Sequence, residues 1–113
     1  MNFNEYQKLT AKTAIYSKKD KNFNYPVSYP VLGLVSEAGE IAGKIKKIYR
    51  DGAGKITKEQ KTELAKELGD VLWYVSQLSS ELRLSLHDIA SENIAKLKSR
   101  KKRGTIIGNG DNR

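Results

Sequence analysis

Apolar residues recur every three or four positions along most of this chain of 113 residues, which is the spacing of one face of an α-helix. The pattern predicts an all-α protein with helices at about residues 4–17, 30–50, 57–82 and 85–101. We expect these helices to form a four-helix bundle that is followed by a basic C-terminal tail.

Polar residues, glycine and proline mark the ends of the expected helices. Asn4 is the expected cap of the first helix, and a loop with two prolines separates that helix from the second. Two glycines after residue 50 favour the end of the second helix. Thr57 followed by Gln60 is a capping box, which predicts the start of the third helix, and Ser85 predicts the start of the fourth.

The second and third helices carry the same pattern, thirty residues apart. In "LVSEAGEIAGKI" and "LAKELGDVLWYV", two acids three positions apart border an apolar stripe. Short connections favour antiparallel packing of neighbouring helices. In that arrangement Glu37 lies level with Asp70, and Glu40 lies level with Glu67. The spacing therefore predicts a cluster of four carboxylates between the two helices.

Four carboxylates at one level repel one another and need a cation to remain ionised together. Oxygen ligands alone suit Mg²⁺, Mn²⁺ or Ca²⁺. A di-iron bundle would need Glu-x-x-His pairs, and neither acid pair contains a histidine. The alternative interpretation is that these residues are ordinary exposed acids on two amphipathic helices.

Composition narrows the class of protein. The chain has no cysteine, which excludes disulfides and thiolate metal sites. No apolar run reaches the roughly 18 residues of a membrane span, and the N-terminus lacks the pattern of a signal peptide. We therefore expect a cytoplasmic protein without a membrane partner. A single domain of this size has a modest core, which favours self-association.

Positive charge is concentrated at the C-terminal end. The formal net charge is +8, and residues 96–113 contain seven basic residues and one acid. Such a segment favours an anionic partner, either a phosphorylated small molecule or a nucleic acid. The segment has no aromatic residues to stack on bases, which makes a nucleic-acid partner the weaker alternative.

The acidic segments resemble those of the MazG-like nucleoside triphosphate pyrophosphohydrolases, an all-α family whose signature is E-x-x-E, a spacer and E-x-x-D. The resemblance rests on "LGLVSEAGEIAGKIKK" and "ELAKELGDVLWY", and the later "ENIAKLKSRKKRG" resembles a segment of the family that faces the nucleotide. It covers roughly residues 4–103. We place a MazG-like domain at residues 1–102 and a basic, glycine-rich tail at residues 103–113.

The resemblance implies Mg²⁺-dependent cleavage of a nucleoside triphosphate between its α and β phosphates, with Mn²⁺ as a substitute ion. The products would be a nucleoside monophosphate and pyrophosphate. The implied metal ligands and catalytic residues are Glu37, Glu40, Glu67 and Asp70.

The same resemblance implies nucleotide and phosphate contacts from Asn93, Lys96 and Arg100, which share one helical face. Lys44, one turn beyond Glu40, is placed to reach a phosphate or to balance the acids. We expect a homodimer or a dimer of dimers. The alternative function is a small basic protein that binds nucleic acid or regulates another process, without catalysis.

Overall fold

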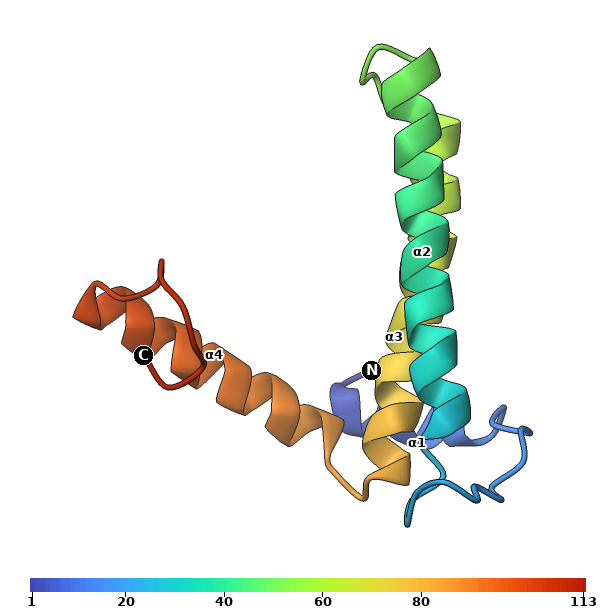
Figure 1. Cartoon of the computed structure of the whole chain (residues 1–113), viewed down its shortest axis with the longest axis vertical. Coiled ribbons are helices and arrows are strands. Elements are labelled where there is room, and N and C mark those ends of the chain that lie inside the picture. The colour runs from blue at the N-terminus through green and yellow to red at the C-terminus, as the bar shows by residue number, and fades with distance from the viewer.

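The computed structural model describes residues 1–113 and contains four α-helices and no strand. The helices are α1 (Phe3–Ala11), α2 (Ser28–Asp51), α3 (Lys58–Glu81) and α4 (Leu86–Arg103), which confirms the predicted all-α, four-helix fold. α2 and α3 form a long antiparallel hairpin, α1 lies at its base, and α4 leaves the base in another direction (Figure 1). None of the four helices has the combined length and hydrophobicity that a membrane span requires.

Side-chain hydrogen bonds account for the starts of α3 and α4. Thr57 accepts from the amide of Gln60, and the Gln60 side chain accepts from the amide of Thr57. The predicted capping box is therefore confirmed. Ser85 accepts from the amide of Asp88 at the start of α4, without the reciprocal bond of a full capping box.

The first helix begins earlier and ends much earlier than the sequence predicts. Asn2, not Asn4, caps α1, in a capping box with Glu5. The helix ends at Ala11 instead of near residue 17. Beyond it, Tyr16 stacks on Tyr29 at the start of α2, with ring centroids 4.8 Å apart. This contact with a distant residue replaces the last turns of the expected helix.

Gln7 of α1 holds the start of α4 in place. Its Nε2 donates to Ser80 Oγ at 3.0 Å and to the carbonyl oxygen of Leu84 at 2.9 Å, and its Oε1 accepts from the amide of Leu86 at 2.9 Å. One side chain thus joins α1, the end of α3 and the first turn of α4, whose amides lack partners within the helix. α4 makes no contact with α2, and its far end projects away from the hairpin (Figure 1).

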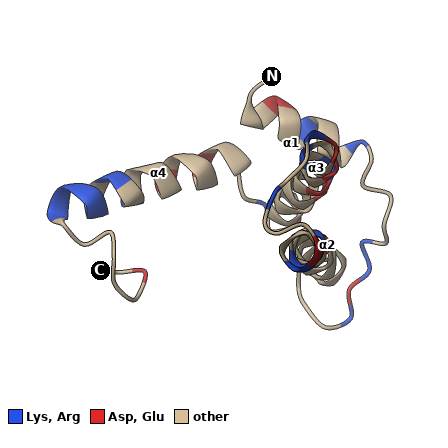
Figure 2. Ribbon diagram, turned by 90° about the horizontal axis from the view of Figure 1, so that it is seen from above, with Lys and Arg blue, Asp and Glu red and all other residues tan.

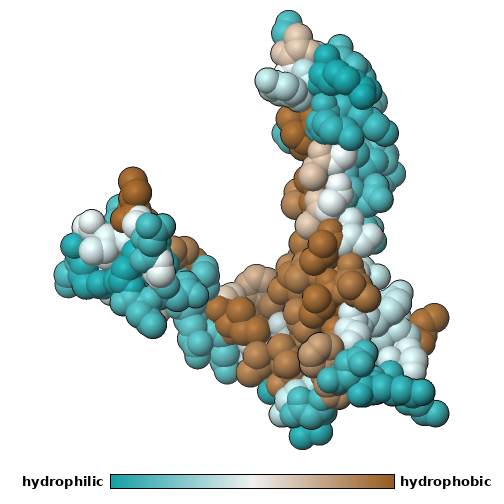
Figure 3. Space-filling model, in the orientation of Figure 1, coloured by the Kyte–Doolittle hydropathy of each residue, from teal (hydrophilic) through white to brown (hydrophobic).

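Little of the chain is buried. Only 8 of the 113 residues are buried, and Ile48 and Leu86 are the large aliphatic residues among them. Leu32, Val35 and Tyr49 on α2 are exposed instead. Apolar surface gathers in the corner between the lower half of the hairpin and α4 (Figure 3). Because burial of apolar surface is the main stabilising contribution in a small domain, this exposure is unusual for a single chain.

Candidate functional site

Three carboxylates meet along the hairpin. Glu37 comes from α2, and Glu67 and Asp70 come from α3; one oxygen atom of each lies within 4.8 Å of the others. The antiparallel arrangement of the two helices brings these acids to one level. Acidic residues occur on both helices of the hairpin, whereas Lys and Arg occupy the far end of α4 (Figure 2).

Glu40 is not part of this group of three. It lies one turn along α2 from Glu37, one step further from the apolar stripe, and its side chain is exposed. Its charge nevertheless contributes to the raised pKa of Glu37. Lys44 lies a further turn along, with its Nζ 3.6 Å from Glu67 Oε1. The structure thus brings three of the four acids together, and the positive charge of Lys44 partly offsets the negative charge of Glu67.

Partial burial and neighbouring charge both raise the pKa of Glu37. Desolvation is the largest cause, followed by the charges of Asp70 and Glu67 on the facing helix. Carboxylates that share a site disfavour each other's ionised form in this way. A cation among them would reverse the effect, and oxygen atoms are the ligands that hard divalent cations prefer.

An aromatic wall borders the carboxylates. Trp73 and Tyr74 follow Asp70 on α3, and these three residues line a cavity of about 360 Å³ together with Thr13 and Glu37. The indole Nε1 of Trp73 donates to Thr13 Oγ1 at 2.8 Å, which orients the ring towards the segment after α1. The acidic group therefore lies beside a partly apolar cavity and not on a bare polar surface.

Tyr74 lies against α2 because that helix has no side chain at Gly33. A Cβ atom at Gly33 would lie 2.1 Å from the Tyr74 ring, so any larger residue would displace the tyrosine. Hydrogen bonding with Tyr29, burial and the charges of Glu37 and Asp70 raise the pKa of Tyr74 to about 12. Sequence reasoning did not predict the contact between Gly33 and Tyr74, although Tyr74 follows Asp70 by one helical turn.

The expected nucleotide-facing residues lie elsewhere in the chain. Asn93 is exposed on α4, Lys96 Nζ lies 3.4 Å from Asp111 Oδ1, and Arg100 donates to the main-chain oxygen of Asp111 at 2.6 Å. Their helix has no contact with α2, which carries Glu37. Within one chain, these three residues therefore lie on a helix that is apart from α2 and Glu37.

Comparison with known proteins places the chain in a family. Residues 29–105 match the family model described as the MazG nucleotide pyrophosphohydrolase domain. That span includes the acidic group on the hairpin and the whole of α4 with its basic residues. The chain is also 49% identical to the Gene 37 protein of Mycobacterium phage L5, over 114 aligned positions that cover the whole of both chains. No solved structure matches the chain. The chain belongs to the MazG nucleotide pyrophosphohydrolase domain family.

Proposed function

We propose that this protein hydrolyses a nucleoside triphosphate between its α and β phosphates and releases a nucleoside monophosphate and pyrophosphate. The observation that carries the proposal is the group formed by Glu37, Glu67 and Asp70, whose oxygen atoms lie within 4.8 Å of one another. Membership of a nucleotide pyrophosphohydrolase family supports this chemistry. Residues 1–102 would form the catalytic domain, with residues 103–113 as its tail.

Mg²⁺ is the proposed cofactor, with Mn²⁺ as a substitute. Glu37, Glu67 and Asp70 would hold the ion. Glu40, one turn along α2 from Glu37, would complete the ligand set with a fourth carboxylate. The raised pKa of Glu37 supports this fit, since the acids repel one another when no positive charge lies between them. When bound, such an ion polarises phosphoryl oxygens and lowers the pKa of a bound water.

Residues around the carboxylates would bind and orient the nucleotide. Lys44 pairs with Glu67 but keeps 36% of its side chain exposed, so it can turn towards a phosphate. Trp73 and Tyr74 offer an apolar surface for the base or the sugar. Because the phenol of Tyr74 stays protonated, it can donate a hydrogen bond to an oxygen of the substrate.

Each site would combine two copies of the chain, in a homodimer or a dimer of dimers. Asn93, Lys96 and Arg100 are the proposed nucleotide and phosphate contacts, but α4 makes no contact with α2 of its own hairpin. The hairpin of a second copy offers the acidic group that these residues lack. Its exposed Leu32 and Val35 would also be covered, which would stabilise the assembly.

Incubation with a panel of nucleoside triphosphates and Mg²⁺, followed by identification of the products, tests the proposal. Monophosphate and pyrophosphate, formed only with a divalent metal, are the expected products. Diphosphate and orthophosphate would contradict the proposed bond. A protein that releases no phosphate product and binds nucleic acid, with an affinity that falls steeply with salt, would instead support the non-catalytic alternative.

A further inference from the structure

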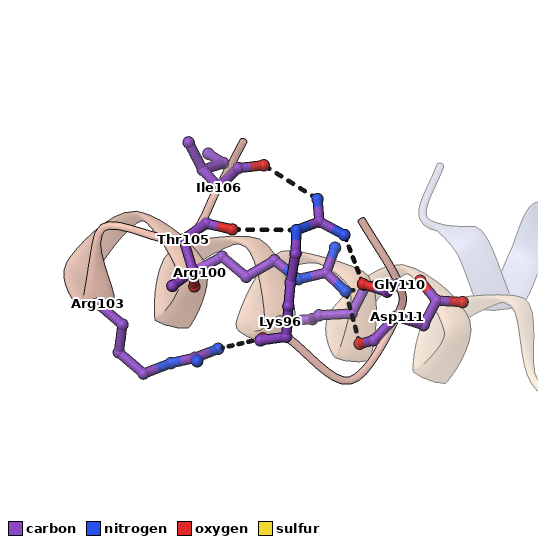
Figure 4. Close-up of polar contacts among 8 residues, drawn as sticks. Lys96, Arg100, Arg103, Thr105, Ile106, Gly110 and Asp111 are labelled. Atoms are coloured by element: carbon purple, nitrogen blue, oxygen red, sulfur yellow. Dashed lines mark hydrogen bonds and ion pairs between the residues drawn. The ribbon is translucent and has the colours of Figure 1, made fainter. Parts of the chain in front are cut away.

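The last ten residues, 104–113, form a compact hook that folds back along α4 (Figure 4). The side chain of Arg113 closes the hook on itself by donating to the carbonyl oxygens of Thr105, Ile106 and Gly110. The shape of the hook therefore depends mainly on hydrogen bonds within it.

A second set of bonds ties the hook to α4. Arg100 Nη2 donates to the main-chain oxygen of Asp111 at 2.6 Å, and Arg103 Nη2 donates to that of Arg113 at 2.9 Å. Asp111 Oδ1 lies 3.4 Å from Lys96 Nζ and 3.5 Å from Arg100 Nη2. These acceptors differ from those that close the hook on itself. The hook can therefore leave α4 without losing its internal bonds, by rotation near Gly104, once the amide of Thr105 releases the carbonyl oxygen of Arg100.

Two features of this contact indicate an anionic ligand. Arg100 has only 5% of its side chain exposed, yet its Nε has no hydrogen-bond partner. Buried donors of this kind are normally paired. In addition, Asp111 is the single acid among seven basic residues between positions 96 and 113, and 87% of its side chain is exposed. The basic cluster can thus accept more negative charge than one carboxylate supplies.

We propose that the hook holds the Asp111 carboxylate beside Lys96 and Arg100, the phosphate contacts of the proposed function, when no ligand is bound. A phosphate chain displaces the hook because it carries several negative charges against the single charge of Asp111. The inference rests on the proposed function, in which these cations receive substrate phosphates or product pyrophosphate. The added element is a competing carboxylate within the chain, which lowers the affinity for substrate and for pyrophosphate.

The contacts of Asp111 are suited to such an exchange. Water screens both ion pairs at the exposed Asp111 carboxylate, and both are longer than a good charge-assisted hydrogen bond. The charges of Lys96 and Arg100 hold the pKa of Asp111 below its usual value, so the competing carboxylate is ionised at neutral pH. Asp111→Asn removes this charge and leaves the main-chain bond to Arg100 available.

Calorimetric titration of inorganic pyrophosphate into the full chain tests the inference. EDTA is present throughout, so that binding does not depend on a metal at the carboxylates. Asp111→Asn should bind pyrophosphate about fivefold more tightly than wild type. Glu59→Gln, which removes an exposed acid at the start of α3, should bind as wild type does. In wild type, the amide of Thr105, which donates to the carbonyl oxygen of Arg100 in α4, should exchange faster when pyrophosphate is added.

Unchanged or weaker binding of pyrophosphate by Asp111→Asn would overturn the inference, and so would unchanged or slower exchange of the Thr105 amide on addition of pyrophosphate. A gain in affinity for a single-stranded oligonucleotide, without a gain for pyrophosphate, would also overturn it. The titration needs no turnover. If the titration gives the expected result but the protein hydrolyses no nucleotide, only the proposed function is wrong. If the protein is an active hydrolase but the titration contradicts the inference, only the role of the hook is wrong.

Discussion

The hairpin and α4 are both charged, amphipathic parts of the chain, but they differ in packing. The hairpin helices contact each other along their length, whereas α4 is attached near one end (Figure 1). α2 and α3, of 24 residues each, lie side by side along the hairpin (Figure 1). α4 is held near its first turn by Gln7 and makes no contact with α2. The hairpin carries acids and bases side by side, whereas the last turn of α4 carries only bases (Figure 2). One chain therefore contains both kinds of residue that phosphate hydrolysis needs, and under our proposal assembly brings them together.

Loss of the acidic group should have the largest effect. Glu37→Gln and Asp70→Asn each remove a charge at nearly constant shape and should lower turnover more than about a hundredfold, because a catalytic metal contributes several kcal/mol. Initial rates of pyrophosphate release measure this effect. Glu59→Gln, an exposed acid on the same hairpin, is the matched control and should keep the wild-type rate. If all three variants kept the wild-type rate, the acidic group would have no role in catalysis.

Mg²⁺ should stabilise the native protein more than sodium does at the same ionic strength. An ion that binds only the native state, at a hundredfold excess over its Kd, adds about 2.7 kcal/mol. At roughly 4–8 °C per kcal/mol, Mg²⁺ should raise the Tm by more than about 10 °C, and sodium at matched ionic strength should not. Glu37→Gln should melt higher than wild type without metal and gain less from it.

The pH dependence of the metal-free protein has a definite sign. Burial and the charges of Asp70 and Glu67 raise the pKa of Glu37, so its ionisation destabilises the native state. The stability of the metal-free protein should therefore fall as the pH rises above 4.5, the usual pKa of a glutamate, and through the raised pKa of Glu37. If Glu37→Gln instead melts below wild type without metal and responds to Mg²⁺ as wild type does, the carboxylates do not share a site.

The Gln7 side chain makes three hydrogen bonds at the attachment of α4. Gln7→Ala removes three hydrogen bonds and leaves groups of Leu84 and Leu86 unpaired, which should lower the free energy of unfolding by about 2 kcal/mol. Gln60→Ala, the control, removes one exposed bond at the start of α3 and should lower it by about 0.5–1 kcal/mol. Circular dichroism melting curves compare the two. A Gln7→Ala variant as stable as Gln60→Ala would show that α4 is held by other contacts.

Two glycines of α2 should respond in opposite directions to alanine. Gly33→Ala pushes a Cβ into the Tyr74 ring and should lower stability by about 1–2 kcal/mol. Gly39→Ala meets nothing within 4 Å and should raise stability by up to about 1 kcal/mol, because alanine favours the helix. Melting temperatures measure both changes. Equal shifts would contradict the close approach of Tyr74 to α2.

Local rules predicted much of the hairpin. The capping box of Thr57 and Gln60 needs only a spacing of three residues, and the level of Glu37 with Asp70 needs only antiparallel packing. Whether these acids bind a metal stays a prediction. The position of Glu40 outside the group of three depends on how its side chain is directed, which spacing along a helix describes only approximately.

Contacts between distant residues were beyond such rules. Gln7 bonds to groups 73–79 residues away, so its role at the start of α4 could not be read from its neighbours. The early end of α1 likewise depends on the stacking of Tyr16 with Tyr29. The hook followed no helical period, and it is held by the side chain of Arg113, the last residue.

Mixing two inactive variants tests the central claim most directly. One variant carries Glu37→Gln on the hairpin, and the other carries Asn93→Ala and Lys96→Ala on the exposed face of α4. In a random mixture of subunits, about a quarter of the sites would combine an intact hairpin with an intact α4 from another copy. The account predicts that pyrophosphate release recovers to about a quarter of the wild-type rate. No recovery, in a mixture whose mixed oligomers are verified by mass spectrometry, would contradict it.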